Sequence, residues 1–311
     1  MEYVLGVDGG ATKTVVQVAD LSGKVVSESE YYSSNFKSVG IETARDNLTR
    51  VVLSAMEKIG LPDNFVFRYA CFGMAGYDTV SDGKNYHKMI FDSGIKKYLK
   101  PKNTLIINDT RIGLSAGSDS KNCIIIICGT GSNCLGINDK GKEVNVNGWD
   151  YILGDEGSGY AIGVKALRAV MRAYDGRGEN TLLFDTIRED LKIKNIPKLV
   201  SWAYGNSFFK VRIAALAKTV CRTAEMGDET AIRILREEAM EAINSISIVV
   251  DKLGLAEKEF DLVFVGNVFK CDKFFKSVLM KEIKARFKKV NFTPLTEKPV
   301  QGAIKLALDK I

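Results

Sequence analysis

The sequence predicts an α/β protein built from two similar halves, because one order of elements is written twice along its 311 residues. Residues 4–20 have the pattern of a strand, a glycine turn and a second strand, with alternating side chains on both sides of the turn. Residues 122–139 repeat this pattern. A third strand candidate, helices and further strands follow each hairpin. Such internal duplication predicts two domains with one topology.

In the first half, we expect the third strand at 24–32 and an amphipathic helix at 42–60, where apolar residues recur every three or four positions. Strands follow at 67–76 and 104–109, and the polar stretch between them has helical character. A further helix is expected to open near Arg111.

In the second half, the third strand is expected at 142–148. The repeat places one domain at 1–113, completed by the C-terminal helix 299–311, and a second domain at 114–298. The remaining predicted elements are helices at 160–174, 210–227, 229–254 and 300–311 and a strand at 260–269.

The composition is that of a globular protein with a substantial core, since 46% of the residues are hydrophobic and 26% are charged. No run approaches the roughly 18 apolar residues that span a bilayer, and the strand pattern begins by Tyr3, which leaves no room for a signal peptide. We therefore expect no membrane partner and a cytoplasmic location. The six cysteines are scattered without a C-x-x-C pair, so neither a zinc site nor a structural disulfide is expected.

The formal net charge of +6 is compatible with a nucleic-acid partner, but the distribution of the basic residues favours another interpretation. They concentrate in 281–290, at helical spacing and with apolar residues between them. This is the pattern of a solvated helix face, and we expect no nucleic acid to bind.

The two glycine turns contain residues suited to binding anions. Neither has the spacing of a dinucleotide-binding or P-loop motif. Glycines nevertheless let successive backbone N–H groups point into one concavity. One such turn is equally compatible with a surface hairpin, whereas two at equivalent places of a repeat favour a phosphate site. The residues are Gly9, Gly10, Thr12 and Lys13 in the first turn and Gly129, Thr130, Gly131 and Ser132 in the second.

Residues 8–14 (DGGATKT) and 129–133 (GTGSN) resemble the phosphate 1 and phosphate 2 loops of the sugar kinase, heat-shock 70 and actin superfamily. Over nearly its whole length the chain resembles the N-acetylglucosamine kinases of the BadF/BadG/BcrA/BcrD ATPase family. Residues 148–163 (GWDYILGDEGSGYAIG) carry most of this resemblance, and SSNFKSVG, GMAGYD, NDT, AEMGDETA and VQGA agree with it in order. The implied fold is two ribonuclease-H-like, actin-like ATPase domains around a central nucleotide and sugar cleft.

The resemblance implies ATP and Mg²⁺ as cofactors, with both glycine turns donating hydrogen bonds to the phosphates. Asp8, at the end of the first strand, would hold Mg²⁺ through water, as one carboxylate suffices for an ion that keeps several waters. The alternative for Asp8 is an Asx turn at a hairpin.

Asp109 follows an apolar strand, and open α/β sheets place their ligands at such strand ends. The resemblance makes Asp109 the general base that accepts the proton of the sugar hydroxyl. The alternative is that Asp109 is the N-cap of the helix that opens near Arg111.

The resemblance also assigns the sugar and adenine contacts. Asn35 and Asp155 match the sugar-contacting positions, since an amide and a carboxylate bind neighbouring hydroxyls. Gly148 and Trp149 are expected to line the same pocket, with a buried core position as the alternative for the tryptophan. The adenine turn is expected at Gly266 and Asn267, where a second glycine would be usual; asparagine tolerates positive φ.

The implied reaction is ATP-dependent phosphorylation of an amino sugar, with N-acetylglucosamine and its 6-hydroxyl as first choice. N-acetylmuramic acid, glucosamine and N-acetylmannosamine remain alternatives, and a homodimer would be ordinary for relatives. A less favoured reading is an ATPase activator of 2-hydroxyacyl-CoA dehydratases or benzoyl-CoA reductases, which needs interface cysteines for an iron–sulfur cluster. We interpret Cys123, Cys128 and Cys134 as core or near-core thiols instead. A sugar-sensing regulator would need a DNA-binding segment before the strand at Tyr3.

Overall fold

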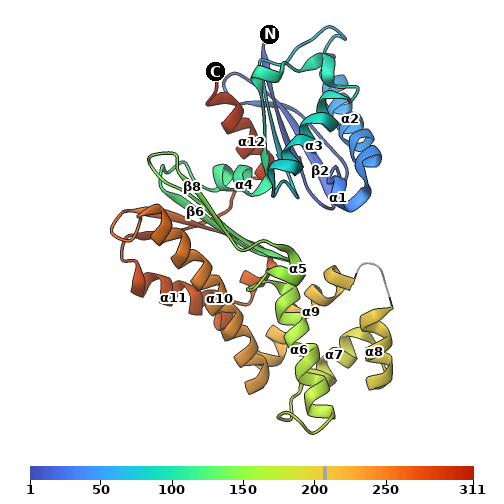
Figure 1. Ribbon diagram of the computed structural model, residues 1–311, viewed down its shortest axis with the longest axis vertical. Helices are drawn as coiled ribbons and strands as arrows, with labels where there is room; N and C mark the ends of the chain where they lie inside the picture. The colour runs from blue at the N-terminus through green and yellow to red at the C-terminus, as the bar shows by residue number, and fades with distance from the viewer. Residues whose placement is uncertain (206–208) are drawn as a thin grey trace. The chain divides into compact units, whose positions relative to one another are not determined.

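The computed structural model describes residues 1–205 and 209–311, which fall into two units (Figure 1). Unit 1 comprises Met1–Asp119 together with Leu295–Ile311, and unit 2 comprises Ser120–Pro294. The domain boundaries expected from the sequence lie after residue 113 and after residue 298. The first falls inside helix α4 (Asp109–Gly117), and the second falls directly before helix α12 (Pro299–Leu308).

The sheet of unit 1 has the strand order β3-β2-β1-β4-β5. β2 is antiparallel to both of its neighbours, β1 and β3, whereas β4 runs parallel to β1 and β5 runs parallel to β4. The carboxyl ends of β1, β4 and β5 therefore lie at one edge of the sheet. The strands are β1 (Tyr3–Gly9), β2 (Lys13–Asp20), β3 (Val25–Tyr32), β4 (Tyr69–Met74) and β5 (Thr104–Asn108).

Helices cover both faces of this sheet, because its central strands are apolar on both sides. Leu5 and Val7 of β1 belong to the core beneath α2 and α3, whereas Val4 belongs to a second core with α4 and α12. Gly302 lets α12 approach closely, since a Cβ there would lie 1.9 Å from the carbonyl oxygen of Ile112. The helices are α1 (Phe36–Val39), α2 (Ile41–Glu57), α3 (Val80–Phe91), α4 (Asp109–Gly117) and α12 (Pro299–Leu308), with 3₁₀ turns η1 (Lys96–Tyr98) and η2 (Pro101–Asn103).

The sheet of unit 2 has the order β10-β9-β6-β7-β8. Counted along the chain, its strands pair in the same order as those of unit 1, with an antiparallel β6-β7-β8 and with β9 and β10 added in parallel. The predicted duplication is confirmed. The strands are β6 (Cys123–Cys128), β7 (Ser132–Ile137), β8 (Glu143–Val146), β9 (Phe260–Val265) and β10 (Val290–Pro294).

The helices of unit 2 share one large core with its sheet. The long helix α10 packs on β6, β7 and β8, and α9 packs on α6, α7 and α8 (Figure 1). The elements are α5 (Asp150–Leu153), α6 (Gly159–Tyr174), α7 (Leu183–Leu191), α8 (Ile196–Tyr204), α9 (Phe209–Glu225), α10 (Glu229–Leu253), the 3₁₀ turn η3 (Asn267–Lys270), the π-helical turn η4 (Asp272–Lys276) and α11 (Ser277–Arg286).

The basic segment 281–290 is helical only in part. Helix α11 ends at Arg286, and Val290, which is 1% exposed, begins β10. The alternation of Val290 and Phe292 is the signal of that strand. Among the described residues, no helix combines the length and the apolar composition needed to cross a bilayer.

The expectation that the chain has no structural disulfide is wrong. Cys221 of α9 is bonded to Cys271, which lies between η3 and η4, with a Cα–Cα distance of 5.8 Å. The two cysteines are 50 residues apart, so their spacing carried no signal. Cys123, Cys128 and Cys134 are buried thiols that form no disulfide, as expected.

Candidate active site

In unit 1, polar side chains gather where β1 and β5 end and where the loops after β3 and β4 begin. Asp8 is the penultimate residue of β1, and Asp109 directly follows β5. In the pairing register, Asp8 stands opposite Gly73 of β4. The topology therefore brings both predicted carboxylates to the same edge of the sheet.

The carboxylate of Asp8 accepts no hydrogen bond from the described part of the chain. Burial is the main cause that raises its pKa to about 7; the negative charge of Asp109 acts in the same direction, and the cation of Lys13 opposes both effects. An Asx turn would need a backbone N–H bonded to this carboxylate, and the described structure has none. Two neighbouring carboxylates in a partly buried position favour a divalent cation between or near them.

Asp109 is the first residue of α4 and does not cap the helix. The N-cap is Asn108, whose Oδ1 accepts a hydrogen bond of 2.8 Å from the N–H of Thr110. The alternative reading of Asp109 as an N-cap is therefore wrong. Burial raises the pKa of Asp109 to about 6, while the N–H of Thr110 opposes this shift. Such a carboxyl is mainly ionised at neutral pH and is still basic enough to accept a proton.

Asn35 begins the short helix α1 beside this edge. Its Oδ1 accepts a hydrogen bond of 2.9 Å from the N–H of Lys37, and the residue is 7% exposed. The backbone of Gly76 passes close by, since a Cβ at Gly76 would lie 3.2 Å from the amide atoms of Asn35. Two loops thus fix the asparagine in place.

Asp78 links several residues of this edge, and sequence reasoning missed it. Its carboxylate accepts from Lys37 Nζ at 3.0 Å and from Asn108 Nδ2 at 3.3 Å. Its negative charge also raises the pKa of Asp109. The position of Asp78 in the segment GMAGYD was the signal available in the sequence.

The first glycine turn joins β1 to β2 and is tied to the segment after β3. The hydroxyl of Ser33 donates to the carbonyl of Gly10 at 3.0 Å. Lys13 is exposed and pairs with Glu30 of β3 at 2.6 Å, an ion pair that contributes little in water. Gly9 is buried, and Thr12 is exposed.

The second glycine turn joins β6 to β7 and is bound by backbone hydrogen bonds to the first residues of α6. The N–H of Gly129 donates to the carbonyl of Gly131 at 2.9 Å, and the carbonyl of Gly129 accepts from Gly159 at 2.8 Å. The carbonyl of Thr130 accepts from Tyr160 at 3.3 Å. A turn fixed in this way presents its remaining donors in one arrangement.

The segment 147–157 concentrates unusual backbone conformation. Of the four described non-glycine residues with positive φ, three lie here: Asn147 (68°), Asp150 (65°) and Asp155 (67°). Gly148 and Gly157 also have positive φ, at 78° and 82°. Left-handed residues of this kind cost energy and cluster at functional sites.

Asn147 holds this segment together, and sequence reasoning missed it. Its Oδ1 accepts from the N–H groups of Gly148 and Asp155, both at 2.8 Å. Its Nδ2 donates to Ser132 Oγ and to the carbonyl of Glu156, both at 2.9 Å. One amide therefore connects the predicted sugar segment to the second glycine turn.

Asp155 is 3% exposed, and both of its carboxylate oxygens have partners. Oδ1 accepts from the N–H of Ser132 at 3.0 Å, and Oδ2 pairs with Lys210 Nζ at 2.9 Å. Lys210 also pairs with Asp150 and lies 5.5 Å from the ring centre of Tyr151. Lys210 was missed because it comes from α9, 55 residues further along the chain.

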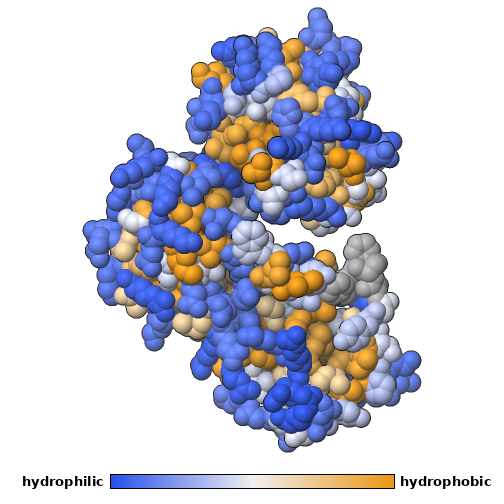
Figure 2. Space-filling view, viewed as in Figure 1, coloured by the Kyte–Doolittle hydropathy of each residue, from blue (hydrophilic) through white to orange (hydrophobic). Residues whose placement is uncertain are grey.

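Trp149 is 58% exposed, so the alternative of a buried core tryptophan is wrong. It directly precedes α5, whose residues Ile152 and Leu153 are 77% and 79% exposed. Figure 2 shows this hydrophobic surface at the place of α5 in Figure 1. An exposed ring beside Gly148 and Asp155 suits stacking on the apolar face of a sugar.

The predicted adenine turn follows β9 and lies against the second glycine turn. Gly266 has φ of 119°, and a Cβ there would lie 2.1 Å from the carbonyl oxygen of Cys128. Asn267 begins η3 and does not have positive φ. The turn therefore needs a glycine at one position only, which explains why asparagine is accepted at the next.

The structure distributes the predicted site residues over the two units. The described residues hold no group of three or more His, Cys, Asp or Glu side chains suited to a metal. Unit 1 carries Asp8, Gly9, Gly10, Thr12, Lys13, Asn35 and Asp109, and unit 2 carries Gly129, Thr130, Gly131, Ser132, Gly148, Trp149, Asp155, Gly266 and Asn267.

Comparison with known proteins gives a consistent picture. Residues 5–307 match the model of the BadF/BadG/BcrA/BcrD ATPase family. An N-acetylmuramic acid/N-acetylglucosamine kinase of Clostridium acetobutylicum is 32% identical over 307 residues, covering 99% of this chain and 98% of the relative. An N-acetyl-D-glucosamine kinase of Dictyostelium discoideum is 33% identical over 318 residues, with the same coverage of each chain.

Among solved structures, a Chromobacterium violaceum protein assigned as an N-acetylglucosamine kinase has a TM-score of 0.74 at 20% identity, with 99% of each chain covered. With the repeated sheet order, this likeness shows a two-domain actin-like ATPase fold.

Proposed function

Because the chain belongs to the BadF/BadG/BcrA/BcrD ATPase family, we propose that it is an ATP-dependent kinase of amino sugars, with the 6-hydroxyl of N-acetylglucosamine as the preferred acceptor. Two relatives that match over almost their full length are named as kinases of such sugars. The observation that carries the proposal is Asp109, a carboxylate at a strand end that caps no helix and has a pKa of about 6. We expect the reaction in the cytoplasm, where ATP is supplied.

Unit 1 supplies the base and the metal ligand in this proposal. Asp109 accepts the proton of the sugar hydroxyl as its oxygen attacks the terminal phosphorus of ATP, whose bond to the bridging oxygen of the β-phosphate breaks so that ADP leaves. Asn35 hydrogen-bonds a neighbouring hydroxyl and so aims the acceptor. Asp8 would hold Mg²⁺ through water, and the raised pKa of this otherwise unpartnered carboxylate fits the role. Bound Mg²⁺ would neutralise charge on the phosphates.

Unit 2 supplies the phosphate donors and the second set of sugar contacts. The turn at 129–132 donates backbone and hydroxyl hydrogen bonds to the phosphates, and Gly266 and Asn267 face the adenine end. Asp155, oriented by Lys210, accepts from a sugar hydroxyl, while Trp149 covers the apolar face of the ring. Because the N–H of Ser132 donates to Asp155, the sugar contact and the phosphate turn are ordered together.

The test is a panel of sugars with ATP and Mg²⁺. N-acetylglucosamine, N-acetylmuramic acid, glucosamine, N-acetylmannosamine and glucose are compared by ADP release, product mass and phosphorus NMR. We expect a sugar phosphate from at least one N-acetylated amino sugar, with the phosphate on O6, and much slower turnover of glucose. ATP hydrolysis without any sugar phosphate would contradict the proposal and favour an ATPase activator, as would an iron-containing preparation.

A further inference from the structure

A buried carboxylate on α10 contacts the substrate segment of unit 2 from inside the core. Glu238 lies in the middle of α10 and is 1% exposed. Its Oε2 accepts a hydrogen bond of 2.6 Å from the N–H of Gly157, and its Oε1 pairs with Lys165 Nζ at 2.9 Å. A charged group at this depth is costly unless both oxygens are satisfied, and here each has one partner.

Gly157 is the point at which this carboxylate can act on the site. Its φ of 82° is left-handed, and a Cβ there would lie 3.3 Å from Cβ of Ala242 and 3.4 Å from the carbonyl oxygen of Glu238. The segment therefore lies directly on α10. Two residues earlier is Asp155, whose carboxylate orders the N–H of Ser132.

The preceding residue, Glu156, makes a second link to the phosphate turn. Its carbonyl oxygen accepts from Ser132 Oγ at 2.7 Å and from Asn147 Nδ2 at 2.9 Å. The hydrogen bond of Glu238 to Gly157 thus fixes the end of a short segment whose other residues contact the phosphate turn. A small displacement of such a segment is expected to cost much activity.

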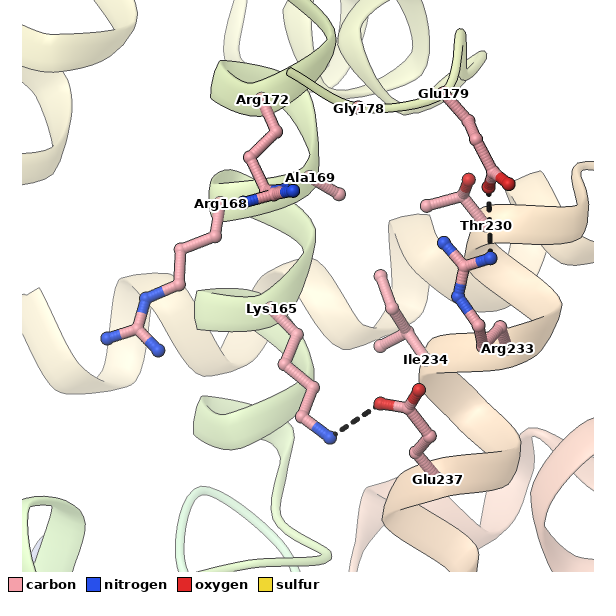
Figure 3. Close-up of a pocket in the computed structure, with 10 residues that line it drawn as sticks. All are labelled: Lys165, Arg168, Ala169, Arg172, Gly178, Glu179, Thr230, Arg233, Ile234 and Glu237. Atoms are coloured by element: carbon pink, nitrogen blue, oxygen red, sulfur yellow. Dashed lines mark hydrogen bonds and ion pairs between the residues drawn. The ribbon is translucent and has the colours of Figure 1, made fainter.

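Lys165 completes the arrangement, and its second partner, Glu237, provides a matched control. Lys165 projects from α6 toward α10 and pairs with Glu237 at 2.8 Å (Figure 3). It also pairs with Glu238. Lys165 and Glu237 line a cavity of about 250 Å³. The side chain of Glu237 is 50% exposed. Glu237 and Glu238 therefore share one cation, but the described structure shows only Glu238 bonded to the substrate segment.

We propose that Glu238 is a positioning residue, which holds Gly157 through its Oε2 and is itself held by Lys165, and so sets Asp155 and Ser132 for sugar and phosphate binding. Glu238 touches neither substrate. Its removal loosens the segment without removing a reacting group. The inference rests on the proposed function, but the hydrogen bond to Gly157 can be tested without it.

The first measurement is amide hydrogen exchange at Gly157 in the wild type, in Glu238→Gln and in the control Glu237→Gln. We expect exchange to be roughly tenfold or more faster in Glu238→Gln only, because the ion pair that holds the side chain is lost. Equal protection in all three proteins would overturn the proposal. This result does not depend on any kinase activity, so it stands apart from a failure of the proposed function.

The second measurement is the steady-state kinetics of the same proteins. We expect Glu238→Gln to raise KM for the sugar roughly tenfold, while Glu237→Gln stays within about twofold of the wild type. A purely structural role would lower the melting temperature of Glu238→Gln and leave KM unchanged at temperatures well below melting, which would overturn the proposal.

A second pair of variants covers the case in which Glu238→Gln fails to fold. Lys165→Met removes the cation and Lys165→Arg keeps it. We expect the methionine variant to raise KM for the sugar and the arginine variant to restore most of the loss. Equal KM values in Lys165→Met and Lys165→Arg would overturn the proposed role of the ion pair between Glu238 and Lys165.

Discussion

At the scale of single residues, the site depends on carboxylates whose surroundings give them different tasks. Asp8 and Asp109 are both partly buried, and burial raises the pKa of each, to about 7 and about 6. Asp109 keeps a backbone donor that opposes the shift, whereas Asp8 has only the distant charge of Lys13. Asp109 is therefore the more fully ionised of the two near neutral pH, and Asp8 is the group that gains more from a cation.

The raised pKa of Asp8 predicts that this residue destabilises the metal-free protein at high pH. Because its pKa in the folded state lies above the ordinary 3.8, the folded state binds the proton more tightly, and stability falls as pH rises from about 4 to about 7. The Asp8→Asn variant has no carboxyl group at this position, so its stability does not fall in this way as pH rises. We expect its free energy of unfolding to exceed that of the wild type by about 4 kcal/mol at pH 8 and to match it near pH 4.

Urea unfolding of both proteins at the two pH values, with a chelator present, measures this difference. Saturating Mg²⁺ with a non-hydrolysable ATP analogue should stabilise the wild type more than the asparagine variant. Equal stability of the two proteins at pH 8 would show that the Asp8 carboxylate is not under electrostatic stress.

At the scale of elements, the segment 147–157 carries most of the site of unit 2, and Asn147 shapes it. The asparagine contributes both a left-handed backbone and four side-chain hydrogen bonds. Asparagine tolerates this conformation better than other non-glycine residues, which explains its presence before a glycine. The two contributions can be separated by substitution.

Asn147→Gly keeps the backbone conformation and loses the amide, whereas Asn147→Ala loses both. We expect the alanine variant to be less stable than the glycine variant by about 1 kcal/mol, because alanine is strained at positive φ. Both should lose sugar affinity by a similar factor, of roughly ten or more, since both lose the amide. Calorimetry and urea unfolding measure these quantities, and normal sugar affinity in the glycine variant would contradict the role of the amide.

The elements that could be predicted from the sequence are those with a local signal. The alternating strands 4–20 and 122–139 and the periodic helices that became α6, α9, α10 and α12 needed only their own residues. Helices α7 and α8 and strand β10 were not anticipated. Lys210, Glu238 and the Cys221–Cys271 bond were not anticipated either, because each depends on a partner tens of residues away.

At the scale of the whole molecule, the repeated topology explains why residues far apart in the sequence can serve one reaction. Each unit has the same strand order, and each has a glycine turn between its first two strands. Asp8 and Asp109 lie in unit 1, whereas Asp155 and the glycine turn that is hydrogen-bonded to α6 lie in unit 2. In the proposed function, the two halves of the duplicated fold therefore contribute different chemistry.

The central claim, that Asp109 is the base of an amino-sugar kinase, is tested most directly by Asp109→Asn. Asparagine keeps the shape but accepts no proton, so kcat should fall by roughly 10²- to 10⁴-fold, while the sugar Kd from calorimetry changes far less. The melting temperature should not fall below that of the wild type, because Asn108 caps the helix and the ionised Asp109, whose pKa is raised, does not stabilise the fold at neutral pH. Turnover of the variant within a small factor of the wild type, on the best sugar of the panel, would contradict the claim.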